Sequence, residues 1–317
     1  MTKSVQDAVE LLRCPACSRQ LRSEEGAFIC IGCATTFFVV NGVPRFVLTP
    51  ADATARRTQA SFGYEWSQFN DWSVSGETNF HQYFSDFDFQ WVRGRTVLDA
   101  GCGMGRHARQ MAPHVGQLIA MDFSQAIDHA ARNTADQPNV FCIQGDITSA
   151  PVADSAFDLV YSLGVLHHLA DTEGAVRSLL SKVKPGGRLR IYLYWRRHGI
   201  AGAILRGVEW VRLVTTRLPF GVLKALCWML SVVLWFAVVL PVRAFSAIGV
   251  RRHEKWPLAV YARYPFAVLY NDQFDRFSAP IEQRWTEGEV RSLMGRLGLR
   301  DVRVMPSFGW IAEGTKP

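Results

Sequence analysis

Short apolar runs alternate with longer segments of helical periodicity between residues 96 and 195. The apolar runs predict strands at 96–100, 118–122, 139–144, 158–162 and 188–194, the last of them after a Pro185-Gly186-Gly187 turn. The segments between them predict helices from about Gly105, over 125–135 and over 172–183. Strands that alternate with helices form a parallel sheet with helices on both faces. The pattern therefore predicts a doubly wound α/β fold.

Elements beyond this region complete the predicted organisation. A helix over 287–297 stops at Gly298, and strands at 302–306 and 309–313 follow it and close the sheet. Near the N-terminus, Asn41-Gly42 between two apolar runs predicts a hairpin. The aromatic-rich segment 61–91 predicts either a cap over a pocket or helices that pack on the core. The predicted parts are residues 1–48, a linker and cap over 49–95, the α/β core over 96–195, a helical insertion over 196–285 and the closing elements over 286–317.

Composition excludes disorder for most of the chain and places its charge in one segment. Of the 317 residues, 49% are hydrophobic and 20% are charged, and the net charge is +7. Residues 196–264 contain eleven Lys/Arg and two acids, a net charge of +9, so the other 248 residues sum to −2. The basic charge therefore belongs to the insertion. The polar start of the chain predicts no secretory leader and a cytoplasmic location.

The insertion combines this charge with the longest apolar run. Residues 225–242 carry no formal charge, and residues 200–218 predict an amphipathic helix with Arg206, Glu209, Arg212 and Arg217 on one face. A basic amphipathic helix is typical of an anionic membrane interface. A single membrane span is excluded, because strands before and after the insertion belong to one sheet. A lid over the active site and a dimer interface remain alternatives.

Two C-x-x-C pairs near the N-terminus predict a metal site. Cys14 and Cys17 are separated by twelve residues from Cys30 and Cys33. Four thiolates are the ligand set of structural zinc, which leaves no open coordination position for catalysis. A unit of about 40 residues has too small a core to fold alone, so the metal should supply its folding energy. We expect one zinc ion per chain, bound in a small zinc ribbon.

The sequence Asp99-Ala100-Gly101-Cys102-Gly103-Met104-Gly105 follows the first core strand. Glycines at these positions let the backbone approach a ligand closely. The carboxylate of Asp99 would repel a pyrophosphate, so the loop favours a ligand with a cationic centre.

This loop resembles motif I of class I S-adenosylmethionine-dependent methyltransferases, of the small-molecule, methyltransferase type 11-like kind. Further motifs over 96–195 and 285–313 resemble the same family, among them Leu166-His167-His168-Leu169 and Lys184-Pro185-Gly186-Gly187. The resemblance implies a Rossmann-like methyltransferase sheet that binds S-adenosylmethionine, with Asp122 on the ribose hydroxyls and Asp146 near the adenine amine. The cofactor-binding residues that it implies are Asp99, Gly101, Cys102, Gly103, Gly105, Asp122, Phe123, Asp146, Ile147 and Ser162.

Two adjacent histidines follow the fourth core strand, at the sheet edge where open α/β sheets bind ligands. An imidazole has a pKa suited to a general base near neutral pH. In similar small-molecule O-methyltransferases a histidine of such a motif has this role, which makes His167 and His168 the catalytic candidates. Packing against the next helix, or capping it, is the alternative for either ring.

The sequence thus predicts a methyltransferase that acts on a small or lipid-linked hydrophobic acceptor, peripheral on the inner face of the membrane. One alternative is an rRNA or tRNA base methyltransferase that recognises RNA through the zinc ribbon. Nucleic acid is disfavoured, because residues 1–48 hold five Lys/Arg and four acids. A non-catalytic interaction protein that keeps the fold is the other alternative. The acceptor atom and the oligomeric state stay open.

Overall fold

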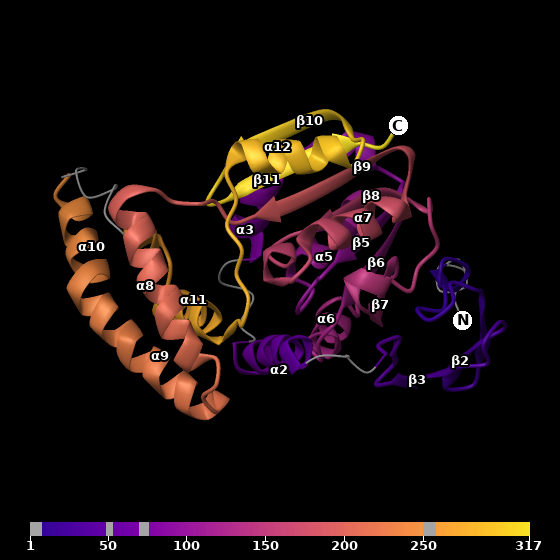
Figure 1. The fold of residues 1–317 in the computed structure, drawn as a ribbon, viewed down its shortest axis with the longest axis horizontal. Coiled ribbons are helices and arrows are strands. Elements are labelled where there is room, and N and C mark those ends of the chain that lie inside the picture. The colour runs from indigo at the N-terminus through magenta and orange to yellow at the C-terminus, as the bar shows by residue number, and fades with distance from the viewer. Residues whose placement is uncertain (1–7, 49–52, 70–75, 250–257) are drawn as a thin grey trace. The chain divides into compact units, whose positions relative to one another are not determined.

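The computed structural model describes residues 8–48, 53–69, 76–249 and 258–317 (Figure 1). These residues form two compact units. The first, which we call the core unit, contains the described residues up to 59, then 76–195 and 281–317. The second, the insertion unit, contains the described residues of 60–75 and 196–280.

The core unit is built on a seven-stranded mixed sheet, as the sequence predicts. Its strand order is β10-β11-β9-β8-β5-β6-β7. The parallel strands are β5 (Thr96–Ala100), β6 (Gln117–Asp122), β7 (Val140–Gln144), β8 (Phe157–Ser162) and β9 (Val183–Leu193). The antiparallel strands at the other edge are β10 (Arg300–Pro306) and β11 (Trp310–Thr315).

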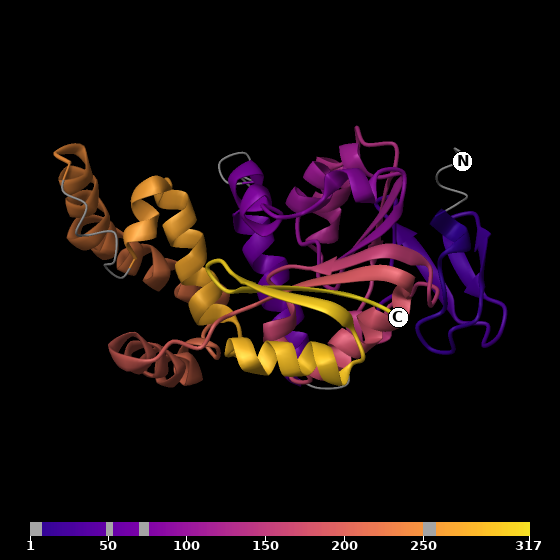
Figure 2. The same ribbon diagram turned by 90° about the horizontal axis from the view of Figure 1, so that it is seen from above.

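Helices cover both faces of the sheet (Figure 2). Leucines and valines of α7 (Thr172–Lys182) and α12 (Glu287–Arg296) pack into the core on one face. On the other face lie α3 (Gly76–Tyr83), α4 (Phe89–Val92), α5 (Arg106–Met111) and α6 (Ile127–Asn133). Three 3-10 turns, η1 (Ala112–His114), η2 (Ile147–Ser149) and η3 (Leu166–His168), follow α5, β7 and β8. The apolar clusters on both faces of the sheet, each covered by helices, confirm the doubly wound arrangement.

One predicted turn is part of a strand. β9 begins at Val183, so the Pro185-Gly186-Gly187 segment lies inside it as an irregularity. Phe157 pairs with Val183, whereas Leu159 pairs with Arg188, so the extra residues bulge out of the ladder. Gly186 adopts φ +75°, a left-handed conformation that glycine adopts without strain.

The N-terminal residues form a four-stranded antiparallel sheet that extends the edge of the large sheet. Its strands are β1 (Leu21–Glu24), β2 (Ala27–Cys30), β3 (Thr36–Val40) and β4 (Val43–Pro44). The predicted hairpin is confirmed, with φ +53° at Asn41 and +78° at Gly42. Just after β4, the Phe46 amide donates to the Gln144 carbonyl of β7 at 2.8 Å. This contact covers an edge strand that would otherwise present unpaired backbone groups.

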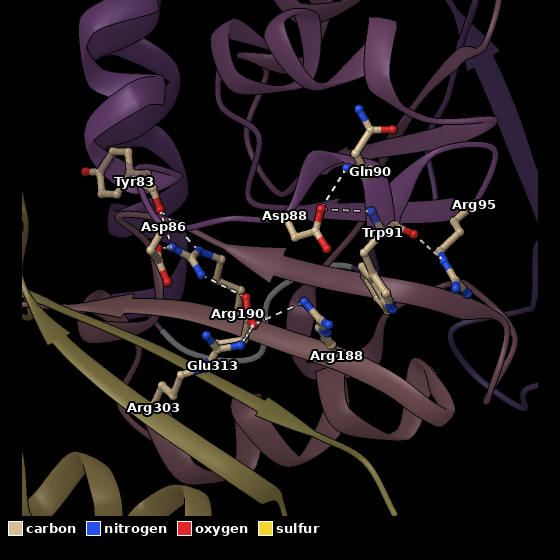
Figure 3. Close-up of polar contacts among 10 residues, drawn as sticks. All are labelled: Tyr83, Asp86, Asp88, Gln90, Trp91, Arg95, Arg188, Arg190, Arg303 and Glu313. Atoms are coloured by element: carbon tan, nitrogen blue, oxygen red, sulfur yellow. Dashed lines mark hydrogen bonds and ion pairs between the residues drawn. The ribbon is translucent and has the colours of Figure 1, made fainter.

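A buried arginine ties the segment between α3 and α4 to the sheet (Figure 3). Arg190 of β9 is fully buried and donates to Glu313 of β11 at 2.8 Å and to Asp86 at 2.5 Å. It also donates to the Tyr83 carbonyl at 2.7 and 3.1 Å. Its guanidinium lies 5.3 Å from the ring centre of Phe84. The network anchors residues 83–86 to the sheet, and α3 and α4 pack on the core. The described residues 61–69 of the aromatic segment belong to the insertion unit.

Replacing Arg190 with Met is expected to lower the free energy of unfolding by about 3–5 kcal/mol. Glu313 would lose its fully buried cation and the Tyr83 carbonyl its donor, whereas Arg188 and Arg303 approach Glu313 only at 3.6 Å. Urea denaturation followed by circular dichroism measures the change. Arg303→Met is the matched control, since Arg303 reaches the same Glu313 at 3.6 Å from an exposed position and should contribute no more than about 1 kcal/mol. Equal losses in the two variants would contradict the prediction.

The insertion unit is a bundle of long helices. They are α8 (Gly199–Thr215), α9 (Phe220–Leu234), the π-helical turn η4 (Trp235–Val239), α10 (Leu240–Ala247) and α11 (Phe266–Ser278), with the 3-10 helix η6 (Ala259–Arg263) before α11. α11 packs against α8 and α9. α2 (Ala53–Gln68) begins in the core unit and ends in this one. Residues 220–247 form one continuous helix that is long and apolar enough to cross a membrane, and only 22% of its most apolar window is buried.

One part of the predicted amphipathic helix is wrong. Arg212 was placed on an exposed basic face with Arg206 and Arg217, but its side chain is buried and donates to the Ala279 carbonyl at 2.5 and 3.2 Å. The carbonyl follows the C-terminal end of α11, where a guanidinium is a favourable donor. The prediction missed the contact because it joins positions 67 residues apart.

Candidate functional site

Three glycines shape the loop between β5 and α5. Gly101, Gly103 and Gly105 all adopt left-handed φ angles, of +87°, +55° and +82°. A Cβ on Gly101 would lie 2.4 Å from Val165, the residue before η3, and a Cβ on Gly105 would lie 3.0 Å from the backbone of Ala130. The loop is therefore pressed against its neighbours and tolerates no side chain at these positions. It ends at the N-terminus of α5, where backbone amides are available to a ligand.

Asp122 holds the loop from the end of β6. One carboxylate oxygen accepts from the Gly103 amide at 2.8 Å, and the other accepts from the Ser124 amide and hydroxyl at 2.8 and 2.7 Å. Burial raises the pKa of Asp122, and these hydrogen bonds oppose the rise. The structure therefore brings two of the predicted cofactor residues, Gly103 and Asp122, into direct contact.

Asp99 lies at the end of β5 and is almost fully buried. Its carboxylate accepts from the Tyr161 hydroxyl at 3.0 Å. Burial raises the pKa of Asp99 to about 8, and the charge of nearby Asp122 adds to the rise. The sequence pattern does not indicate Tyr161 as a site residue, because its contact with Asp99 depends on the register of β5 and β8.

The other predicted cofactor residues surround this loop in different ways. Cys102 is buried beside Gly103, and the Phe123 carbonyl accepts from Gln59 and Gln144. Asp146 caps η2 by accepting from the Thr148 amide at 2.8 Å. The side chains of Ile147 and Ser162 are buried, the first in the core against α7 and the second donating to the Ala100 carbonyl. These contacts of Ile147 and Ser162 stabilise the elements that carry the loop, and a ligand role for Asp146, Ile147 and Ser162 stays a prediction.

This arrangement of a parallel sheet, a glycine loop and two carboxylates matches a known domain. Residues 98–191 match the family model described as a methyltransferase domain. The chain contains a class I S-adenosylmethionine-dependent methyltransferase domain. The glycine loop, β6 and the turn after β8 all belong to the matched part of the methyltransferase domain.

Relatives of the methyltransferase domain align with part of the chain. It is 29% identical over 118 residues to the sterol 24-C-methyltransferase of Schizosaccharomyces pombe. That alignment covers 35% of this chain and 31% of that protein. It is 37% identical over 101 residues to the ubiquinone biosynthesis O-methyltransferase of Alkalilimnicola ehrlichii. That alignment covers 31% of this chain and 41% of that protein. The chain thus spans less than half the length of these relatives. The structure of human N-acetylserotonin methyltransferase with S-adenosylmethionine matches at a TM-score of 0.48 and 15% identity, over 84% of this chain and 60% of that one.

The two histidines of the methyltransferase domain lie in η3, and both are buried. The ring of His167 stacks on Tyr194, with 3.8 Å between ring centres. The Nδ1 atom of His168 lies 2.7 Å from the Ile281 carbonyl oxygen. Because a carbonyl only accepts, Nδ1 of His168 carries the proton, which leaves Nε2 with the lone pair in the neutral ring. The two rings therefore have different surroundings.

A short segment before α12 holds these histidines and was missed from the sequence. The Gln283 amide donates to the His167 carbonyl at 2.7 Å, and its side chain donates to the Leu169 and Ala170 carbonyls. The Trp285 amide donates to the Tyr194 carbonyl at 2.8 Å. No local pattern in the sequence marks residues 281–284, because these contacts with the histidine turn join positions more than 80 residues apart.

Cofactor affinity is expected to fall by about tenfold per pH unit as the pH drops below about 8. The raised pKa of Asp99 means that this carboxyl is protonated below that pH, and a cationic ligand requires its ionised form. Calorimetric titration with S-adenosylmethionine between pH 6 and 9 measures the slope. Asp99→Asn should bind more weakly and lose the slope, and an equal slope in that variant would contradict the assignment.

Proposed function

We propose that this protein transfers a methyl group from S-adenosylmethionine to a small or lipid-linked hydrophobic acceptor. The observation that supports this acceptor class is a group of aromatic rings around the turn after β8 and the end of β9. We call it the aromatic cluster, and it consists of Tyr83, His167, Tyr192, Tyr194 and Phe308. It lies at the carboxyl ends of β8 and β9, which is the edge of an open α/β sheet where ligands bind.

The rings of the aromatic cluster form a continuous apolar wall. Tyr83, Tyr192 and Phe308 contact one another with ring centres 5.0–5.2 Å apart. Tyr194 joins them through Tyr192 at 5.8 Å. Phe308 is 41% exposed, so the wall extends from the core to the surface. Such a wall favours a hydrophobic acceptor over a strongly polar one.

The charges beside the aromatic cluster favour a neutral or anionic acceptor. The Arg284 guanidinium lies 5.4 Å from the ring centre of Tyr194 and is paired with Glu282. A second cation at the same ring would be repelled by Arg284. In this proposal His168 removes the acceptor proton through Nε2, because the Ile281 carbonyl fixes the proton on Nδ1. His167, which stacks on Tyr194, forms part of the wall.

We also infer that the four N-terminal cysteines hold one structural zinc ion. Their sulfur atoms all lie within 4.8 Å of one another. Cys14 and Cys33 are 3.6 Å apart, and Cys17 and Cys30 are 3.3 Å apart. Four thiolates around a tetrahedral zinc ion, each about 2.3 Å from the metal, have sulfur separations of this size. The ion would stabilise the ribbon and take no part in methyl transfer.

We place the enzyme at an anionic membrane surface, as a peripheral protein on the cytoplasmic face. This location is supported by the basic insertion, whose long helix is mostly exposed, and by the hydrophobic acceptor class. The insertion unit is then the membrane element, and the core unit contains the catalytic domain.

The test is methyl transfer from radiolabelled S-adenosylmethionine to separate lipid, RNA and protein fractions of a cell extract. We expect label in the lipid-extractable fraction. Gly101→Val is the control, because a Cβ at Gly101 already meets Val165, so the variant should not transfer label. Label in RNA would overturn the acceptor class in favour of a base methyltransferase. No label in any fraction, with folded protein that binds the cofactor, would favour a non-catalytic protein.

A further inference from the structure

The long helix of the insertion unit carries an apolar stripe on its exposed side. The stripe consists of Val222, Leu226, Met229, Val233, Phe236 and Leu240, all of them exposed. Their spacing of four and three residues places them along one face of the continuous helix 220–247. Phe236, near the middle, is 66% exposed. Stable soluble surfaces seldom expose so many large apolar side chains together.

A second apolar patch lies on α8. Trp210, Leu213 and Val214 are exposed, and Trp210 is 73% exposed. Arg206 and Arg217, four residues before Trp210 and three after Val214, are exposed on the same face. The sequence predicted a basic face that includes Arg212. In the structure Arg212 is buried, and the exposed side of α8 carries Trp210, Leu213 and Val214.

The exposed side of the long helix is held in place by its buried side. Leu223 and Cys227 pack with Phe274 of α11 in a small hydrophobic core. Lys224, the one charge between Phe220 and Val242, is turned away from the stripe and donates to Gln68 at 2.6 Å. The stripe is therefore held in place by packing on the opposite side of the helix, and it contains no charged side chain.

Positive charge borders this surface. At one end, Arg217 is exposed and donates to the Leu213 carbonyl. At the other end, Arg243 is exposed, donates to the carbonyls of Ala262 and Tyr264, and lies over the Trp235 ring. Within the described residues neither guanidinium is paired with a carboxylate, so both positive charges can contact lipid phosphates.

We propose that the stripe and the α8 patch together insert into the interface of an anionic lipid bilayer, with both helices parallel to the membrane plane. The proposal rests on the membrane location in the proposed function and names the surface that makes the contact. Apolar side chains would enter the acyl boundary while Arg217 and Arg243 contact phosphates. A spanning orientation is excluded for α8, which carries Arg206, Glu209 and Arg212 along its length.

A second copy of the chain fits this surface less well than a bilayer does. A two-helix seam is narrow and is flanked by charged positions that select the partner. Here Trp228, also exposed, widens the apolar face beyond the stripe, and no charged residue flanks it between Phe220 and Val242 other than the inward Lys224. A wide uncharged face bordered by arginines matches the chemistry of a lipid surface.

The test is flotation of the full chain with vesicles of 70% phosphatidylcholine and 30% phosphatidylglycerol at low salt. We expect the wild type to float with these vesicles. Val233→Asp should lower the partition coefficient by about 10- to 100-fold, because a charge replaces an inserted apolar group. Phe38→Asp is the matched control at a similarly exposed site in the ribbon, 65% against 61%, and should float like the wild type.

Arg217→Gln tests the contribution of electrostatic attraction to vesicle binding. It should weaken binding to the anionic vesicles about fivefold and leave binding to pure phosphatidylcholine vesicles unchanged. Wild type that stays in the soluble fraction, or equal loss in Val233→Asp and Phe38→Asp, would overturn the proposal. So would sedimentation showing a wild-type dimer that Val233→Asp converts to a monomer, which would assign the surface to a second copy. Methyl transfer to a detergent-solubilised acceptor reports on the proposed function separately, because Val233→Asp should retain it.

Discussion

Removing zinc from the four-cysteine site is expected to unfold residues 8–48 and to release one zinc ion per chain. Structural zinc in small domains contributes about 10–16 kcal/mol of apparent binding free energy, which such domains cannot replace by packing. Within the ribbon, the buried packing centres on Phe46, which contacts Phe28 and Phe37 edge to face at 5.5 and 5.3 Å. A chelator titration, with zinc followed by a metallochromic dye and folding by hydrogen exchange, measures both effects.

The ribbon also covers an edge of the large sheet, so we expect its unfolding to affect β7 as well. Unfolding would remove the Phe46 amide from the Gln144 carbonyl and the Arg45 ion pair with Asp128. We therefore expect faster exchange in β7 and aggregation through its exposed edge. Cys17→Ser should reproduce the effect, whereas Cys227→Ser, outside the cluster, should keep one zinc ion. Native exchange over 8–48 in metal-free protein would show that the ribbon folds without the ion.

The parts of the fold that the sequence predicted are those that local physics determines. The hairpin at Asn41-Gly42 and the end of α12 before Gly298 depend on backbone conformations that these residues favour, φ +78° at Gly42 and +79° at Gly298. The strands of the core depend on runs of apolar residues that a parallel sheet buries on both faces. Such signals lie within a few residues of the structure that they specify.

The parts that the sequence did not predict depend on pairs far apart in the chain. Arg190 finds Glu313 across 123 positions, and Tyr161 finds Asp99 across 62. A charged residue within a strand pattern gives no sign of whether it will be buried and paired. The same holds for Arg212, whose helical position alone placed it with the exposed arginines. Buried polar partners of this kind are set by the register of strands and the packing of helices.

The candidate site divides in the same way. The glycine loop and Asp122 follow from a contiguous motif, and the structure brings them together through a 2.8 Å hydrogen bond. The environment of His168 follows from residue 281, where the chain returns from the insertion unit to the core unit. The sequence could therefore name both histidines but could not separate their roles.

His168→Gln is expected to lower methyl-transfer turnover by about 10²–10⁴-fold, the usual contribution of a general base. A glutamine amide can still donate to the Ile281 carbonyl, so the turn around η3 should keep its fold. It cannot accept a proton from the acceptor, so kcat should fall while the affinity for S-adenosylmethionine is unchanged. Single-turnover transfer of label into the lipid fraction, measured from pH 5.5 to 9, should also lose the rise in rate that ionisation of an imidazole produces.

His167→Gln is the matched control, because His167 stacks on Tyr194 and belongs to the wall of the aromatic cluster. We expect it to raise KM for the acceptor and to keep the shape of the pH profile. The reverse outcome, with the pH-dependent step lost in His167→Gln, would assign the base to the other ring. Unchanged turnover in His168→Gln would mean that the acceptor atom needs no proton removed by this ring, and that the enzyme accelerates methyl transfer through orientation of the two substrates.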